Sequence, residues 1–189
     1  MRLRLALTIG TTLVALLAAS VYSLARTPDA PGPLALSAQG VGPLQLGRSY
    51  DEAAGLALRV APDNALAGLG CGGLDEVRYS GELEGRPVSA MAMADQGKLI
   101  EIELSLDAPL QADSEAACVA LRDEFATPFV ARFGPVEKRW EERKPVSREH
   151  LVATGPVVLV ARWFPTGGSC YISAHYGYGA SLSAADAAW

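Results

Sequence analysis

The feature that most constrains the fold of this chain is the alternation of apolar and polar residues between positions 99 and 106. Ile102 and Leu104 alternate with Glu101, Glu103 and Ser105, which is the two-residue period of a strand that buries one face. We therefore expect a half-buried strand here. Its glutamates are expected to face water and to protect the sheet from edge-to-edge pairing, rather than to act as acid and base.

Other segments carry weaker strand patterns. We expect further strands at residues 75–80, 86–95, 136–142, 157–164 and 170–178, and a long loop at residues 143–156. Tight turns are expected at residues 95–98 and 166–169, because glycine there permits a hairpin.

Two helices are expected ahead of these strand groups. Ser49 and Glu52 fit a capping box, so the first helix should run to about residue 59, with Ala53, Leu56 and Val60 toward the core. The second should begin at residue 113 or 114 and end at Gly134. Its apolar face carries Cys118, Leu121, Phe125, Phe129 and Phe133.

The order helix, three strands, helix, three strands predicts an α+β fold. We expect tandem helix-plus-three-strand units, with the helices packed on an antiparallel sheet. The units would be pseudo-repeats at residues 49–106 and 113–178, inside a single domain spanning 39–178. Residues 179–189 would form a tail.

The N-terminus has the pattern of an export signal. Arg2 and Arg4 precede an uncharged stretch that reaches Ala25, as in a signal peptide, and the stretch is also long enough for a membrane anchor. Residues 1–25 are expected to be one or the other, and residues 26–38 a proline-rich linker. Either reading predicts a periplasmic body, soluble after leader cleavage or tethered to the inner membrane. Contact with the membrane is expected only through the N-terminal segment.

The charge balance restricts the partners. The chain has a formal net charge of -5 and its two N-terminal arginines lie in the leader, so the body is more acidic still. An acidic body argues against nonspecific binding to nucleic acid. We expect no nucleic-acid partner.

The segment "GVGPLQLGRSYDEAA" at residues 40–54 resembles the opening of many small exported bacterial proteins similar to the β-lactamase inhibitory protein and to BamE-type lipoproteins. That resemblance implies a helix followed by an antiparallel sheet, sometimes in tandem, and binding to envelope proteins rather than catalysis. The chain departs from the pattern at Arg48, where methionine is usual, and it lacks the lipobox cysteine. The matching residues are Gly40, Gly42, Pro43, Leu44, Leu46, Gly47, Ser49, Glu52 and Ala53.

The glycine turn in that segment has two interpretations. A strand, a glycine and a helix N-terminus together are able to cradle a phosphate. Here the turn has a single glycine, Gly47, and Ser49 is used as a cap. We therefore expect Gly47 to set the turn into the helix.

Three cysteines allow three pairings and leave one thiol over. We favour a Cys118–Cys170 disulfide, because Cys118 lies on the apolar helix face and Cys170 shares strand parity with Ile172 and Ala174. Cys71, in "GLGCGG", then remains as a possible free thiol. It is either a reactive nucleophile exposed by glycines or an inert loop cysteine.

Catalytic and metal-binding patterns are weak. A cysteine nucleophile needs a base, and the body offers only His150 and His175, neither tied by spacing to Cys71. The cysteines and histidines show no paired metal-ligand spacing, and no G-x-S-x-G is present. We expect no cofactor, no metal and no catalytic residue.

Aromatic residues give the remaining hint about function. Tyr171 and His175 are expected to line one sheet face, as in protein-binding surfaces. Trp163 either joins them there or belongs to the core. The favoured hypothesis is a non-enzymatic module that binds an envelope protein. The alternative is a small thiol-dependent enzyme or redox protein using Cys71, so enzymatic activity stays open.

Overall fold

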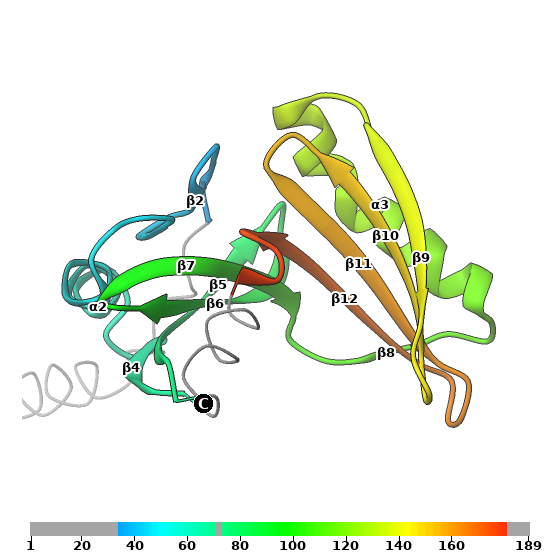
Figure 1. Ribbon diagram of the computed structural model, residues 1–189, viewed down its shortest axis with the longest axis horizontal. Coiled ribbons are helices and arrows are strands. Elements are labelled where there is room, and N and C mark those ends of the chain that lie inside the picture. The colour runs from blue at the N-terminus through cyan, green and yellow to red at the C-terminus, as the bar shows by residue number, and fades with distance from the viewer. Residues whose placement is uncertain (1–33, 71–72, 181–189) are drawn as a thin grey trace, which may run out of the picture. The chain divides into compact units, whose positions relative to one another are not determined.

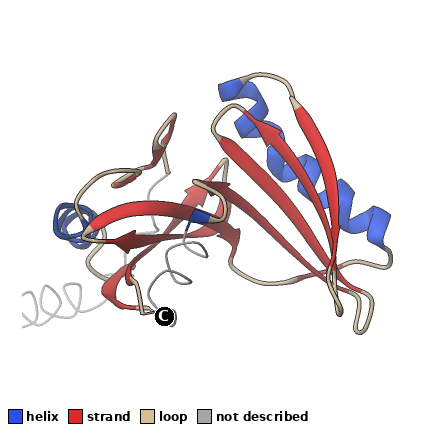
Figure 2. Cartoon of the chain, viewed as in Figure 1, coloured by secondary structure: helices blue, strands red, loops and turns tan. Residues whose placement is uncertain are grey.

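The computed structural model describes residues 34–70 and 73–180, which form an α+β fold with two helices and a large antiparallel sheet (Figures 1 and 2). The strand order in the main sheet is β4-β5-β6-β7-β12-β11-β10-β9, and β8 pairs with β12. Its first strands are β4 (Ala65–Leu69), β5 (Asp75–Leu83), β6 (Arg86–Asp95) and β7 (Lys98–Leu106). The others are β8 (Leu110–Gln111), β9 (Lys138–Arg143), β10 (Arg148–Thr154), β11 (Val157–Phe164) and β12 (Ser169–Tyr176).

The two helices share one core. Buried residues of α2 (Tyr50–Val60) and α3 (Glu115–Phe133) belong to a single apolar cluster with one face of the main sheet. We call this the core face and the opposite one the outer face. Helices on one face of an antiparallel sheet, as the sequence predicted, are confirmed.

Helix α2 begins where the sequence predicts. The Ser49 hydroxyl accepts a hydrogen bond from the Glu52 amide at 3.3 Å, which satisfies one of the free amides of the first turn. Ala53 and Ala57 are fully buried, whereas Val60 is 63% exposed. The expectation that Val60 faces the core is wrong, because the packed stripe of α2 is made of small alanines.

The turn before α2 is architectural. The Gly47 amide donates to the Leu99 carbonyl at 2.8 Å, and the Tyr50 amide donates to the Gly97 carbonyl at 2.9 Å. Gly47 has φ +77°, a conformation that glycine adopts without strain. These amides are occupied, so the prediction that Gly47 sets the turn is confirmed.

Helix α3 is anchored at both ends as predicted. The Ser114 hydroxyl accepts from the Ala117 amide at 3.2 Å, and the helix ends at Gly134, whose φ is +101°. Phe125 and Phe129 are buried with rings 5.6 Å apart. The apolar face read from the sequence is therefore the packed face.

Three strands of the main sheet were not predicted. Strand β4 lies between α2 and β5, the short β8 precedes α3, and β10 lies inside residues 143–156, which were expected to form a loop. The charged residues of β10 read as a loop in the sequence, but they are paired in the sheet: Glu149 accepts from Arg162 Nε on β11 at 2.7 Å. Helix α2 is thus followed by β4–β7 and the two-residue β8, and α3 by β9–β12, rather than each by three strands.

A bulge between β6 and β7 changes which side chains face the core. Met93 pairs with Glu101 and Ala94 pairs with Leu99, which leaves Ile100 without a partner across the hairpin. Glu101 is only 4% exposed. The expectation that Glu101 faces water is wrong, and β7 lies between β6 and β12 rather than at an edge.

The small sheet β1 (Leu36–Ser37), β2 (Gly40–Val41) and β3 (Leu44–Gln45) precedes α2. Leu34 is buried and Leu36–Ser37 form β1, so the body begins before residue 39 and the predicted linker range is too long at its C-terminal end. The predicted leader, residues 1–25, lies outside the described residues, as do residues 181–189 of the tail. Neither helix in the described part of the chain has the length and apolarity to cross a bilayer.

Candidate functional site

The outer face gathers polar side chains from neighbouring strands. On β12, Tyr171, Ser173 and His175 alternate with core residues. Ser173 pairs with Ser105 on β7, and His175 pairs with Glu103. Antiparallel partners point to the same side of a sheet, so these five residues share the outer face.

His175 is the centre of a hydrogen-bonded series on this face. Its Nε2 lies 2.8 Å from Ser173 Oγ and its Nδ1 lies 3.2 Å from Glu101 Oε1. His175 is 8% exposed and Glu101 is 4% exposed. Glu101 reaches this face by ordinary alternation along β7, because Ile102 and Leu104 point to the core.

The two distances are consistent with one arrangement of the protons on the His175 ring and the Ser173 hydroxyl. When Nδ1 carries the proton and donates to Glu101, Nε2 is left as an acceptor for the Ser173 hydroxyl. The hydroxyl is then oriented toward a base, and the base toward a carboxylate. Sequence reasoning placed Ser173 and His175 on one face and missed Glu101, which is 74 positions away from His175.

Tyr178 closes one side of the imidazole. Its ring lies 5.3 Å from the His175 ring in an edge-to-face arrangement. Burial raises the pKa of the Tyr178 phenol above its usual range. The Glu142 and Glu149 carboxylates raise that pKa further, while Lys144 and Arg162 oppose the shift. The phenol is therefore neutral at physiological pH.

Ser173 opens onto a hollow of about 220 Å³, which we call the Ser173 hollow. Tyr171, Arg162, Glu103 and Ser105 also line it. Tyr171 is 47% exposed and packs edge-to-face on Phe164. It therefore forms a solvent-exposed rim of the Ser173 hollow. Arg162 Nε binds Glu149, which leaves its two Nη atoms without a hydrogen bond to any described residue.

A second hollow of about 450 Å³ adjoins the first, and we call it the Met91 hollow. Met91, Arg78 and Leu66 line it, and it shares Glu103 and Ser105 with the Ser173 hollow. Within residues 34–70 and 73–180, no hydrogen bond or ion pair joins the Glu103 carboxylate to another side chain. An unpaired carboxylate thus lies on the wall common to both hollows.

The predicted aromatic set is split between the two faces. Tyr171 and His175 share the outer face as expected, although His175 is buried. Trp163 pairs with Cys170 and packs against the core cluster, so its expected place beside Tyr171 is wrong. The reason is parity, because Arg162, not Trp163, is the residue opposite Tyr171.

The cysteine prediction is confirmed for one pair. Cys118 on α3 and Cys170 on β12 form a disulfide across the core, with the Cα atoms 5.5 Å apart. Cys71 lies outside the described residues. Its role as a free thiol and the alternative function built on it stay predictions.

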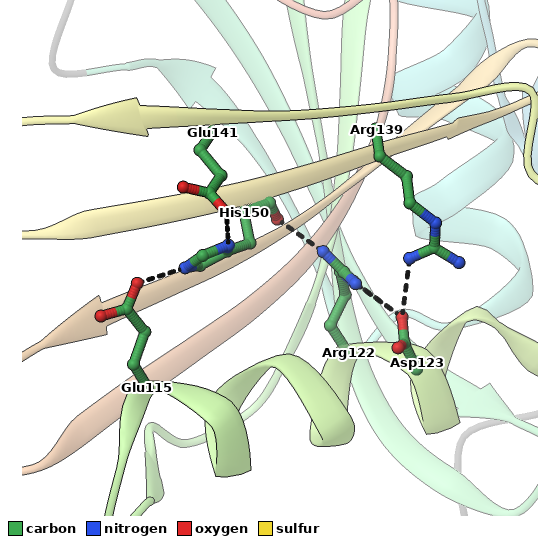
Figure 3. A network of polar contacts seen from close by, with 6 residues as sticks. All are labelled: Glu115, Arg122, Asp123, Arg139, Glu141 and His150. Atoms are coloured by element: carbon green, nitrogen blue, oxygen red, sulfur yellow. Dashed lines mark hydrogen bonds and ion pairs between the residues drawn. The ribbon is translucent and has the colours of Figure 1, made fainter.

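A second polar cluster lies on the core face, where α3 meets β9 and β10 (Figure 3). His150 Nε2 lies 2.5 Å from Glu115 Oε1, and its Nδ1 lies 3.3 Å from Glu141 Oε1. Only the imidazolium has a proton on each nitrogen to donate to both carboxylates. This cluster ties the first turn of α3 to two strands.

The same cluster contains a buried arginine. Arg122 is 2% exposed, and its Nη1 donates to the His150 carbonyl at 3.0 Å. Its Nη2 donates to Asp123 at 2.6 Å, and Asp123 lies 3.9 Å from Arg139 (Figure 3). These contacts satisfy the charge of Arg122. The cluster therefore has a structural role in holding α3 against β9 and β10, and we call it the clamp between α3 and β10.

Metal ligation finds no support in the described part of the chain, where no group of three or more histidine, cysteine or acidic residues is placed to hold an ion. The two carboxylates around His150 approach opposite nitrogens of one ring (Figure 3). They therefore do not converge on a shared point.

In comparisons with known proteins, no protein-family model, no curated protein and no solved structure matches the chain.

Proposed function

We propose that this protein binds another protein of the cell envelope on its outer face, and that Glu103 receives a lysine or arginine side chain of that partner. The observation that carries the proposal is the unpaired Glu103 carboxylate on the common wall of the two hollows. A carboxylate in such a place favours a cation that brings complementary charge.

The surroundings of Glu103 suit a protein segment. Met91 faces it from β6 and Tyr171 borders the Ser173 hollow. Methionine adapts its shape to irregular partners, and tyrosine supplies a large contact at low entropy cost. The preferred partner is a loop with one basic residue between apolar ones.

An extracytoplasmic place for the body is part of this proposal. The leader pattern of residues 1–25 favours export, into the periplasm or to an inner-membrane tether. The Cys118–Cys170 disulfide adds support, because such bonds persist in oxidising compartments.

We further propose that the domain is a tandem of two related units, in line with the resemblance seen in residues 40–54. Helix α2 is followed by β4–β7, and α3 is followed by β9–β12, with β8 before α3. A shared plan of one helix and four strands supports the proposal. Unit boundaries near residues 49–106 and 113–178 follow from it.

The test uses a photoreactive amino acid in place of Ser105, on the wall that both hollows share, in the full chain expressed in its own cells. We expect one main cross-linked protein, identified by mass spectrometry. The same photoreactive residue at Glu124, on α3 and 61% exposed, is the positional control and should not capture that protein.

Affinity for the purified partner then tests the role of Glu103. We expect Glu103→Gln to weaken binding about tenfold or more, and added salt to weaken the wild-type complex because it screens the pair. Glu124→Gln should leave the affinity unchanged. Equal affinity of the wild type and Glu103→Gln would rule out the proposal.

A further inference from the structure

We propose that Ser173 is a nucleophile activated by His175 and Glu101, and that the Ser173 hollow accepts small carboxylic esters. The hydroxyl, imidazole and carboxylate lie in series at 2.8 Å and 3.2 Å. Acyl-transfer sites on unrelated folds share this series, and they are recognised by geometry rather than by sequence position.

The series supports a balanced two-step reaction. Ser173 Oγ attacks the ester carbonyl carbon, and the hydroxyl proton passes to His175 Nε2. The C–O bond to the alcohol breaks, and the leaving oxygen takes that proton from Nε2. Water then attacks the acyl-serine with Nε2 as base, releasing the carboxylic acid and restoring the Ser173 hydroxyl.

Glu101 is the positioning residue of the series. Its carboxylate lies 3.2 Å from His175 Nδ1, and Glu101 itself is only 4% exposed. It keeps the proton on Nδ1, so that Nε2 is the basic nitrogen, and it balances the imidazolium formed when Ser173 is deprotonated.

The hollow defines the substrate class. Its volume of about 220 Å³ is below the range of about 300–1,000 Å³ that is usual for drug-sized ligands, so the acyl group must be small. Arg162 lines the same hollow with its Nη atoms free of described partners. A guanidinium there stabilises the negative charge that develops on the carbonyl oxygen.

The inference is separate from the partner proposal, because it concerns the reactivity of one hydroxyl and needs no second protein. The contrasting explanation is that Ser173 and Glu101 only satisfy a buried histidine. In that case Ser173 would react no faster than an ordinary surface serine, which gives the two explanations opposite outcomes.

The experiment treats the full chain with a fluorophosphonate, which bonds covalently to activated serines, and locates the label by peptide mass spectrometry. We expect one labelled residue, Ser173. Ser173→Ala should remove the label, whereas Ser37→Ala, in β1 and outside the lining of both hollows, should keep it. A label on another residue, or no label, would overturn the inference.

Variants of the other two members separate reactivity from folding. We expect His175→Gln and Glu101→Gln to slow labelling by about 100-fold or more. Glu101→Asp, which keeps the carboxylate, should restore a large part of the rate, and urea unfolding should show that all three variants are folded. Labelling at the wild-type rate in folded His175→Gln would refute the role of the base.

Discussion

Two polar atoms buried in the described part of the core lack a hydrogen-bond partner there: Trp163 Nε1 and Tyr176 Oη. Tyr176 is fully buried, and its ring packs edge-to-face on Phe133. Burying a hydroxyl without a partner costs free energy, so the ring of Tyr176 stabilises the fold while its hydroxyl opposes it.

Tyr176→Phe should therefore stabilise the protein. The substitution keeps the ring and removes an unsatisfied hydroxyl, so we expect the free energy of unfolding to rise by about 1 kcal/mol. Urea denaturation at pH 7 measures it. A loss of stability would show that the hydroxyl has a favourable contact.

The free energy of unfolding at alkaline pH should also depend on Tyr176. Burial raises the pKa of the Tyr176 phenol well above its usual range, and Arg132 only partly offsets this. The unfolded chain loses the proton from about pH 10, whereas the folded protein keeps it. Protonation of Tyr176 therefore gives its full contribution to the free energy of unfolding below about pH 10. That contribution is lost as the pH rises toward the pKa of the folded state.

The expected slope is about 1.4 kcal/mol of unfolding free energy per pH unit from this residue. Measuring unfolding free energies between pH 8 and 11 for the wild type and Tyr176→Phe isolates it, since the other tyrosines are common to both. Parallel curves would contradict the assignment.

At the scale of elements, the clamp between α3 and β10 is held by Arg122. Its loss leaves the partly buried His150 carbonyl without the hydrogen bond from Arg122. We expect Arg122→Met to lower the free energy of unfolding by about 2 kcal/mol, as for hydrogen bonds from charged donors. Arg132→Met, an exposed change on the same helix, should alter it by less than about 0.5 kcal/mol.

The elements that local patterns describe were predictable. Caps at Ser49 and Ser114, the span of β6 and β11, and the Cys118–Cys170 pair follow from spacing and side-chain chemistry. Strand β10 was not predictable in this way. Glu149 contacts Arg162 on β11. His150 contacts Glu141 on β9 and Glu115 on α3. Such long-range contacts do not show in a local pattern.

The candidate site was predictable only in part, for a related reason. Alternation along one strand placed Ser173 and His175 on a common face. Glu101 joins them through strand pairing between β7 and β12. This long-range pairing has no local signal. Alternation along β7 put Glu101 on the correct face, but it did not show that the side chain is buried beside His175.

At the scale of the whole described domain, one sheet and one core span both helix-plus-strand groups. The disulfide joins α3 to β12, which lies beside β7, across a sequence separation of 52. It should therefore stabilise the domain as a whole rather than one end of it.

Replacing both Cys118 and Cys170 by alanine should lower the free energy of unfolding by about 4 kcal/mol, on the chain-entropy model for a loop of this length. We expect a single urea transition for the wild type, displaced to lower urea in the variant. A reductant should shift the wild type in the same direction and leave the variant unchanged. Two separate transitions in the wild type would contradict a shared core.

The position of β12 has a consequence for how the chain acquires its structure. It is synthesised after every other strand of the main sheet, yet it lies between β7 and β11. Until it emerges, both neighbours present bare backbone donors and acceptors along one side, which is a hazard for aggregation. Nearly the whole domain must therefore be synthesised before all strands of the sheet are paired. Any chaperone that protects the nascent chain would have to shield β7 while residues 107–168 are made, whereas β11 emerges just before β12 and is exposed only briefly.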